Sequence, residues 1–165
     1  MRFSTLATTA LSATLTSARI IGISTPSTLS PNTSFPLTLI TEGYIQTVAD
    51  IAIAYGFQLP SERYPLGFPG SLGGFAKSAY LGPQNSNTVG NVTVNATVPA
   101  ELASQTYQGK DVVLTAGIYS IYGASGDVGV YGWNVTVRIG EATGGENVSS
   151  VEQAWKKNTV TPVVV

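Results

Sequence analysis

The sequence predicts an all-β protein, a single immunoglobulin-like antiparallel β-sandwich of about seven strands with no disulfide. Short segments alternate apolar and polar residues with the period of two that a half-buried strand requires. Glycine- and proline-rich turns separate these segments, and no long helix is evident. The 165 residues are enough for one domain with a sizeable core, and they include no cysteine. The two sheets must therefore be held together by packing alone.

The clearest element is a pair of strands between Gln108 and Gly140. In residues 133–139 every odd position is apolar and every even position is polar, from Trp133 to Ile139. The preceding strand covers residues 112–122 and places Leu114, Ala116 and Ile118 on one face. Four glycines mark the turn region between the two strands, namely Gly123, Gly126, Gly129 and Gly132. Because two strands this apolar are not stable alone in water, we expect the rest of the chain to supply the sheet that packs against them.

The elements before this pair follow in order. A first strand over residues 19–23 is expected to end at Pro26, and a second places Phe35, Leu37 and Leu39 on one face. Pro36 suggests that the second strand lies at an edge or begins there. Residues 44–57 form a third strand, with Ile51, Ile53, Tyr55 and Phe57 on one face. A helix is the competing interpretation of this segment, because alanine is a good helix former.

Residues 60–90 contain many glycines and prolines and predict a long loop with one short strand near residues 75–81. Such loops are often functional, although a plain crossover between sheets is an equal alternative. A clear strand follows over residues 89–98, and residues 99–103 predict a single helical turn. The acids Asp111 and Asp127 fall in predicted turns, while Asp50 falls on the third strand, where a buried, paired carboxylate is an open alternative.

Both ends of the chain lie outside the predicted sandwich, which covers residues 19–140. Residues 1–18 combine a short basic start, an apolar run and small residues before Arg19, and so predict a signal peptide. Residues 141–165 predict a polar linker and a C-terminal tail, with a short helix over residues 149–157 opened by Ser149 as its cap. No segment is long and apolar enough to span a membrane or to signal a lipid anchor.

Five N-x-Ser/Thr sequons agree with secretion and are candidate glycosylation sites: Asn32, Asn91, Asn95, Asn134 and Asn147. Asn91, Asn95 and Asn134 fall on the polar faces of their predicted strands. A glycan there would not disturb a core. The alternative is that these residues are simply the solvent face of a sheet with few charges.

The composition excludes several functions. Charged residues make up 10% of the chain, with nine acids and eight bases, so a nucleic acid is not an expected partner. Histidine and cysteine are both absent, which removes the commonest general base, thiolate nucleophiles and the usual ligands of zinc. We therefore expect neither an enzyme nor a cofactor, and no metal site.

Five short motifs lie along the chain: residues 18–23 (ARIIGI), 44–56 (YIQTVADIAIAYG), 64–73 (YPLGFPGSLG), 98–100 (VPA) and 119–126 (YSIYGASG). Together they resemble the necrosis-inducing secreted protein family of fungal effectors. The resemblance implies a secreted protein, acting in the host cell, that binds and inhibits plant immune receptor-associated protein kinases. It further implies suppression of pattern-triggered immunity and induction of cell death. The family supplies no established catalytic residues to carry over.

Two groups of residues are candidates for contact with a partner. Tyr119, Tyr122 and Tyr131 cluster around one predicted loop and would suit either a protein or, as the alternative function, a carbohydrate. They are also ordinary sheet residues. In the tail, Val151 and Trp155 fall on one side of the predicted helix, beside Lys156 and Lys157. Trp155 either contacts a partner or folds back to cover a sheet edge of the sandwich.

Overall fold

The computed structural model describes residues 17–157, which form nine β-strands and two short 3₁₀ helices. The strands are β1 (Ser17–Leu29), β2 (Ser34–Tyr44), β3 (Val48–Gln58), β4 (Gly74–Tyr80), β5 (Val92–Thr97), β6 (Asp111–Tyr122), β7 (Asp127–Ile139), β8 (Gly144–Ser149) and β9 (Trp155–Lys157). The helices are η1 (Pro83–Asn85) and η2 (Ala100–Ala103), the second of which confirms the helical turn predicted after Pro99. Within the described residues, no helix has the length and apolar character needed to cross a bilayer.

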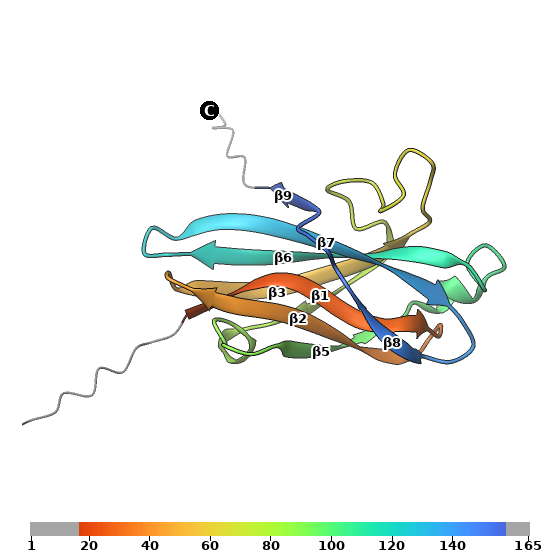
Figure 1. The fold of residues 1–165 in the computed structure, drawn as a ribbon, viewed down its shortest axis with the longest axis horizontal. Coiled ribbons are helices and arrows are strands. Elements are labelled where there is room, and N and C mark those ends of the chain that lie inside the picture. The colour runs from red at the N-terminus through yellow and green to blue at the C-terminus, as the bar shows by residue number, and fades with distance from the viewer. Residues whose placement is uncertain (1–16, 158–165) are drawn as a thin grey trace, which may run out of the picture.

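The strands form two layers that face each other (Figure 1). One layer has the order β4-β3-β6-β7 and the other β1-β2-β5, with β8 added beside β1. The first, second and fifth strands thus oppose the third, sixth and seventh, which is the division found in the immunoglobulin fold. The layers touch where Thr28 and Leu29 of β1 pair in parallel with Arg138 and Ile139 of β7. All other strand pairs are antiparallel, so the predicted fold class is confirmed, with nine strands instead of about seven.

The hairpin of β6 and β7 supplies much of the core. All odd positions from Trp133 to Ile139 are buried, as predicted, and so are Leu114, Ala116 and Ile118 of β6. Across the interior, the Tyr55 hydroxyl donates to the Thr97 carbonyl oxygen at 3.2 Å and accepts from the Thr97 N–H at 2.8 Å. This side chain therefore links β3 of one layer to β5 of the other. Removal of such a paired group typically costs about 1–3 kcal/mol.

Three details of the predicted strands are wrong. The first strand does not end at Pro26 but continues to Leu29, because β1 pairs with β8 from Ser24 to Thr28, beyond its last pair with β2 at Ser24. In β3 a register shift after Asp50 leaves Ile51 only half-buried and turns Asp50 inward. Gly129 and Gly132 lie within β7, so the turn spans only residues 123–126.

The tail differs most from the prediction, since residues 149–157 form no helix. β8 pairs with β1 and β9 pairs with β7, mostly at positions where β1 and β7 do not pair with each other. Figure 1 shows this segment running from β1 across to β7. Unpaired strand edges offer the backbone a full set of hydrogen bonds, which outweighs a weak local preference for helix. Ser17 and Ala18, predicted as the end of the signal peptide, are part of β1, while its residues 1–16 and the tail residues 158–165 lie outside the described residues.

Candidate functional site

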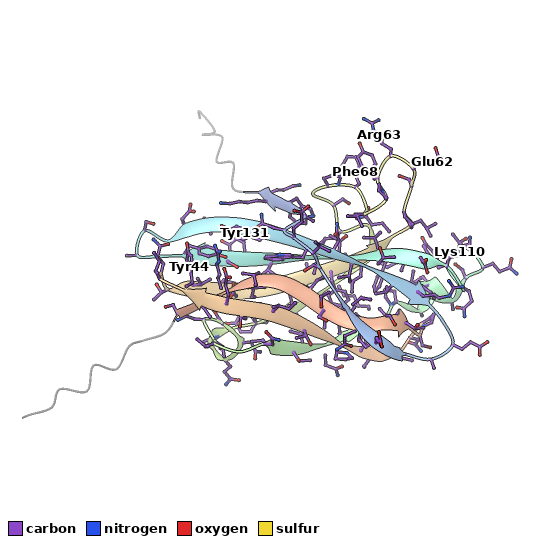
Figure 2. All side chains as sticks on the ribbon, viewed as in Figure 1. Tyr44, Glu62, Arg63, Phe68, Lys110 and Tyr131 are labelled. Atoms are coloured by element: carbon purple, nitrogen blue, oxygen red, sulfur yellow. The ribbon has the colours of Figure 1, made fainter. Side chains whose placement is uncertain are left out.

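A pocket of about 730 Å³ opens at one end of the sandwich, and we call it the end pocket. The start of β1, the turn between β2 and β3, the β6–β7 hairpin and the tail all contribute to its lining. Figure 2 shows Tyr44 and Tyr131, from opposite layers, at this end of the molecule. The lining residues are Arg19, Ile20, Ile21, Tyr44, Gln46, Tyr122, Ser125, Asp127, Tyr131, Trp133, Gln153 and Lys156.

Four aromatic rings follow one another along the wall of the end pocket. Tyr44 meets Tyr122 edge-to-face at 6.0 Å between ring centroids, and Tyr122 meets Tyr131 at 5.2 Å. Tyr131 then stacks on Trp133 at 6.5 Å. Cations lie over the two outer tyrosines, because Arg19 is 4.7 Å from the Tyr44 centroid and the Lys156 ammonium 5.2 Å from that of Tyr131. These contacts hold both cations in defined positions.

One buried acid lies beside this wall, and the half-buried Tyr122 within the wall is titratable too. Asp50 is 2% exposed and accepts a 2.5 Å hydrogen bond from the Ser120 hydroxyl. Burial raises the pKa of Asp50, and the bond from Ser120 opposes part of that rise. Burial also raises the pKa of Tyr122 to about 12, helped by the nearby Tyr131 and Asp50. The Tyr122 phenol is therefore protonated at physiological pH. Asp50 is buried as the sequence suggested, with a hydroxyl as its partner.

A second candidate surface is the outer face of the β4-β3-β6-β7 layer, called here the outer face. One row of paired residues crosses it from Tyr80 through Ala52, Tyr119 and Val130 to Lys157. The Tyr80 and Tyr119 side chains are 73% and 41% exposed. The next row consists of the small residues Ser78, Ala54, Gly117 and Gly132, and it ends at Trp155. Only Lys157 carries a charge in these two rows.

The loop of residues 59–73 projects over the adjoining part of the outer face, as Figure 1 shows. Gln58 holds the loop at its base: its Nε2 donates to the Ser71 carbonyl oxygen at 3.0 Å, and its Oε1 accepts from the Phe68 N–H at 2.9 Å. Asn134 of β7 holds it further out, since its Nδ2 donates to the Leu66 carbonyl oxygen at 2.7 Å. Leu66 and Phe68 nevertheless remain more than half exposed, and Figure 2 shows Phe68 on the projecting part.

Trp155 of β9 packs on the outer face. Its indole lies against Gly132 and Gly117, where a β-carbon would meet the ring. It also lines a groove of about 590 Å³ between the loop and the tail, together with Leu66, Pro69 and Val151. β9 thus pairs with the edge of β7, and Trp155 covers the neighbouring sheet surface. Of the two alternatives for Trp155, the structure shows the one in which it folds back on the sandwich.

The candidate residues predicted from the sequence therefore fall at two places. Tyr122, Tyr131 and Lys156 line the end pocket, whereas Tyr119, Val151, Trp155 and Lys157 lie on the outer face or beside it. Side chains alternate between the two faces of a strand, and Tyr119 is three residues from Tyr122 on β6. Tyr119 therefore points to the opposite face of the sheet from Tyr122. Sequence reasoning missed Arg19, Tyr44 and Gln58, since only the tertiary fold brings them to these places.

The sequons are distributed unevenly over the two layers. Asn91 and Asn95 lie at or on β5, Asn147 lies on β8, and Asn32 lies in the β1–β2 turn; all four side chains are exposed. Asn134 alone belongs to the β4-β3-β6-β7 layer, and it is half-buried under the loop. Across residues 17–157, no three acidic side chains gather as metal ligands would.

Comparison with known proteins places these features in a family. Residues 16–138 match the Nis1 family. The chain is 42% identical to necrosis-inducing secreted protein 1 of Colletotrichum higginsianum over 136 residues, which cover 82% of this chain and 88% of the relative. It is 41% identical to the protein of the same name from Colletotrichum orbiculare, over 87% of this chain and 83% of that relative.

Proposed function

The chain belongs to the Nis1 family of necrosis-inducing secreted fungal proteins, and on this premise we propose that it is a secreted effector that induces cell death in plant tissue. The observation that carries the proposal is 42% identity over 82% of the chain to a protein named for secretion and necrosis induction. We further propose that it binds and inhibits immune receptor-associated kinases in the host cell and so suppresses pattern-triggered immunity. The family resemblance in the sequence motivates this finer statement.

The proposed mode of action is binding and not catalysis. The sequence contains neither histidine nor cysteine, and the buried Asp50 is engaged by the Ser120 hydroxyl. Two exposed acids, Glu42 and Asp111, form surface salt bridges with Arg19 and Arg138. A protein of this kind acts on a kinase by occupying a surface that the kinase needs, which requires contact area and shape and no reacting group.

The outer face is the surface that best fits such a partner. Exposed Tyr80 and Tyr119 stand on either side of the small Ala52, and the loop adds exposed Leu66 and Phe68. Aromatic residues without neighbouring charge are typical of the centre of protein interfaces, and large exposed apolar patches mark interaction sites. The two rows carry a charge only at Lys157, so a partner would bring an uncharged, apolar patch to this face.

The position of the sequons supports the same assignment. The four exposed sequon residues belong to the β1-β2-β5-β8 side, where a bulky glycan would stand between the protein and any partner. The opposite layer presents one sequon, Asn134, whose Nδ2 is already used to hold the loop. Glycans on this protein would therefore leave the outer face free for contact.

The experiment that tests the finer proposal measures binding and inhibition together. The mature chain is mixed with purified kinase domains of plant immune receptors, and both co-precipitation and phosphorylation of a substrate peptide are measured. We expect binding and inhibition by the native chain, and loss of both when Tyr80→Ala and Tyr119→Ala are combined. Val89→Ala is the matched control, because Val89 is an exposed aliphatic residue near β5. A chain that provokes cell death without binding any kinase would contradict the kinase proposal and leave the effector proposal standing.

A further inference from the structure

The end pocket is built from side chains that balance one another in charge. The Arg19 guanidinium donates to Glu42 Oε1 through Nε at 2.8 Å and through Nη2 at 2.6 Å, so its charge is matched. The Lys156 ammonium and the Asp127 carboxylate both line the pocket and offset each other. A doubly charged phosphate group would find no set of free arginines here, in contrast to sites that recognise phosphate. The balance favours a ligand without net charge.

The same lining offers several hydrogen-bonding groups beside its aromatic rings. Gln46 and Gln153 contribute amides, and Ser125 contributes a hydroxyl. Tyr122 contributes a phenol hydroxyl. Such a lining matches a ligand whose groups both donate and accept, as hydroxyl groups do.

Aromatic rings form the walls of the end pocket. The chain of rings from Tyr44 to Trp133 provides apolar surface beside the polar groups, and the volume of about 730 Å³ is that of a small-molecule site. A sugar ring presents hydroxyls around its rim and C–H groups on its faces, so it can satisfy both kinds of surface. A peptide presents only one amide donor and one carbonyl acceptor per residue, which would leave more of these side chains unpaired.

We propose that the end pocket binds a neutral oligosaccharide, with Gln46 and Gln153 donating to its oxygens and the tyrosine rings and Trp133 contacting its C–H faces. This site is separate from the outer face proposed for the protein partner. The tail contributes to it directly, since Gln153 and Lys156 line the pocket. Trp155, which lies between them in sequence, packs on the outer face instead. The protein would thus carry a sugar site and a protein site on different surfaces.

The two tryptophans of the chain allow a direct test, because Trp133 lines the pocket and Trp155 does not. In a Trp155→Phe chain, whose folding is first verified by its melting temperature, fluorescence reports on Trp133 alone. Soluble hexasaccharides of chitin, cellulose and β-1,3-glucan are titrated in turn, and saturation-transfer NMR on the sugar protons provides a second readout. We expect at least one of them to shift the Trp133 emission in a saturable way. Hexagalacturonate, which is charged at every ring, is expected to bind at least about ten times more weakly.

Variants locate the binding. Gln46→Ala and Gln153→Ala are each expected to weaken it by about five-fold, as the loss of one hydrogen bond does. Tyr119→Ala on the outer face is the control and should leave both fluorescence and NMR titrations unchanged. Kinase binding by Gln153→Ala should also be unchanged, which separates this proposal from the proposed function. Absence of binding by both readouts for all three neutral sugars would overturn it. Stronger binding of hexagalacturonate than of the neutral sugars would also overturn it. The same holds if Tyr119→Ala loses sugar binding while Gln153→Ala binds as tightly as the native chain.

Discussion

Trp155 lies directly against Gly132, in a place that exists only because Gly132 has no side chain. The two residues are paired across β9 and β7, and a β-carbon on Gly132 would overlap atoms of the indole ring. Gly117, the partner of Gly132 on β6, would bring a β-carbon within 3.0 Å of the same ring. The glycines of the hairpin thus form the floor on which the end of the chain docks.

Gly132→Ala is therefore expected to destabilise the fold by about 1–3 kcal/mol, the usual cost of overpacking, because the indole must move away. Chemical unfolding measures this cost. Gly144→Ala is the matched control, since a β-carbon there meets nothing within 4 Å, and it should change stability by less than about 0.5 kcal/mol. In a Trp155→Ala chain the Gly132→Ala change should cost much less. Equal costs in both backgrounds would show that the two residues do not interact.

Truncation after Gly145 is expected to lower the melting temperature and to increase binding of a hydrophobic dye. It removes all of β9 and most of β8, and so uncovers the edges of β1 and β7. A chain that ends at Lys157 keeps both strands and serves as the control. An unchanged melting temperature after truncation at Gly145 would mean that the tail does not contribute to stability.

Asn134→Asp is expected to destabilise the unglycosylated protein, made in bacteria, by about 1–3 kcal/mol. The substitution replaces the Nδ2 donor to the Leu66 carbonyl oxygen with a carboxylate oxygen, which repels that carbonyl. At an exposed sequon residue the same substitution would be tolerated. Proteolysis of the 59–73 loop should become faster as well. Asn95→Asp on the exposed side of β5 is the control, and a similar loss of stability there would contradict the explanation.

Asp50 gives the protein a pH dependence that Asp50→Asn should remove. Burial raises the pKa of Asp50 in the folded state above its value of 3.8 in the unfolded chain, so the folded state retains the proton longer. The contribution of this group to stability is therefore greatest below about pH 4 and decreases as the pH rises through the folded pKa. The melting temperature is measured at pH 3.5, 5 and 7. As the pH rises over this range, it should fall less in Asp50→Asn than in the native chain. A steeper fall in the variant would contradict the assignment.

The sequence predicted those strands whose own residues alternate between apolar and polar. The alternation in residues 133–139 identified β7 and its buried face, and the glycine-rich segments identified turns. β8 and β9 could not be predicted in this way, because Gly144–Ser149 and Trp155–Lys157 show no alternation. They become strands only because β1 and β7 present edges to them.

The candidate site was predictable to the same extent. Tyr122 and Tyr131 were recognised from the hairpin, which is local in sequence. Arg19, Tyr44 and Gln153 complete the end pocket from segments far apart in the chain, so no spacing could reveal them. The face of the sheet on which Tyr119 lies follows from the alternation of side chains along its strand. That Tyr119 lies in one row with Tyr80 depends on the register of β3 with β4 and β6.

In the proposed mode of action the outer face contacts the partner, and a glycan placed on that face tests this contact most directly. Ala76→Asn creates an N-x-Ser sequon with Ser78 on the exposed strand β4. Ala76→Gln changes the side chain without creating a sequon. Both chains are secreted from a glycosylating host, checked for folding and for the added glycan by mass, and infiltrated into leaves to score cell death. We expect Ala76→Gln to act like the native chain and glycosylated Ala76→Asn to lose cell-death activity. Full activity of glycosylated Ala76→Asn would contradict the claim.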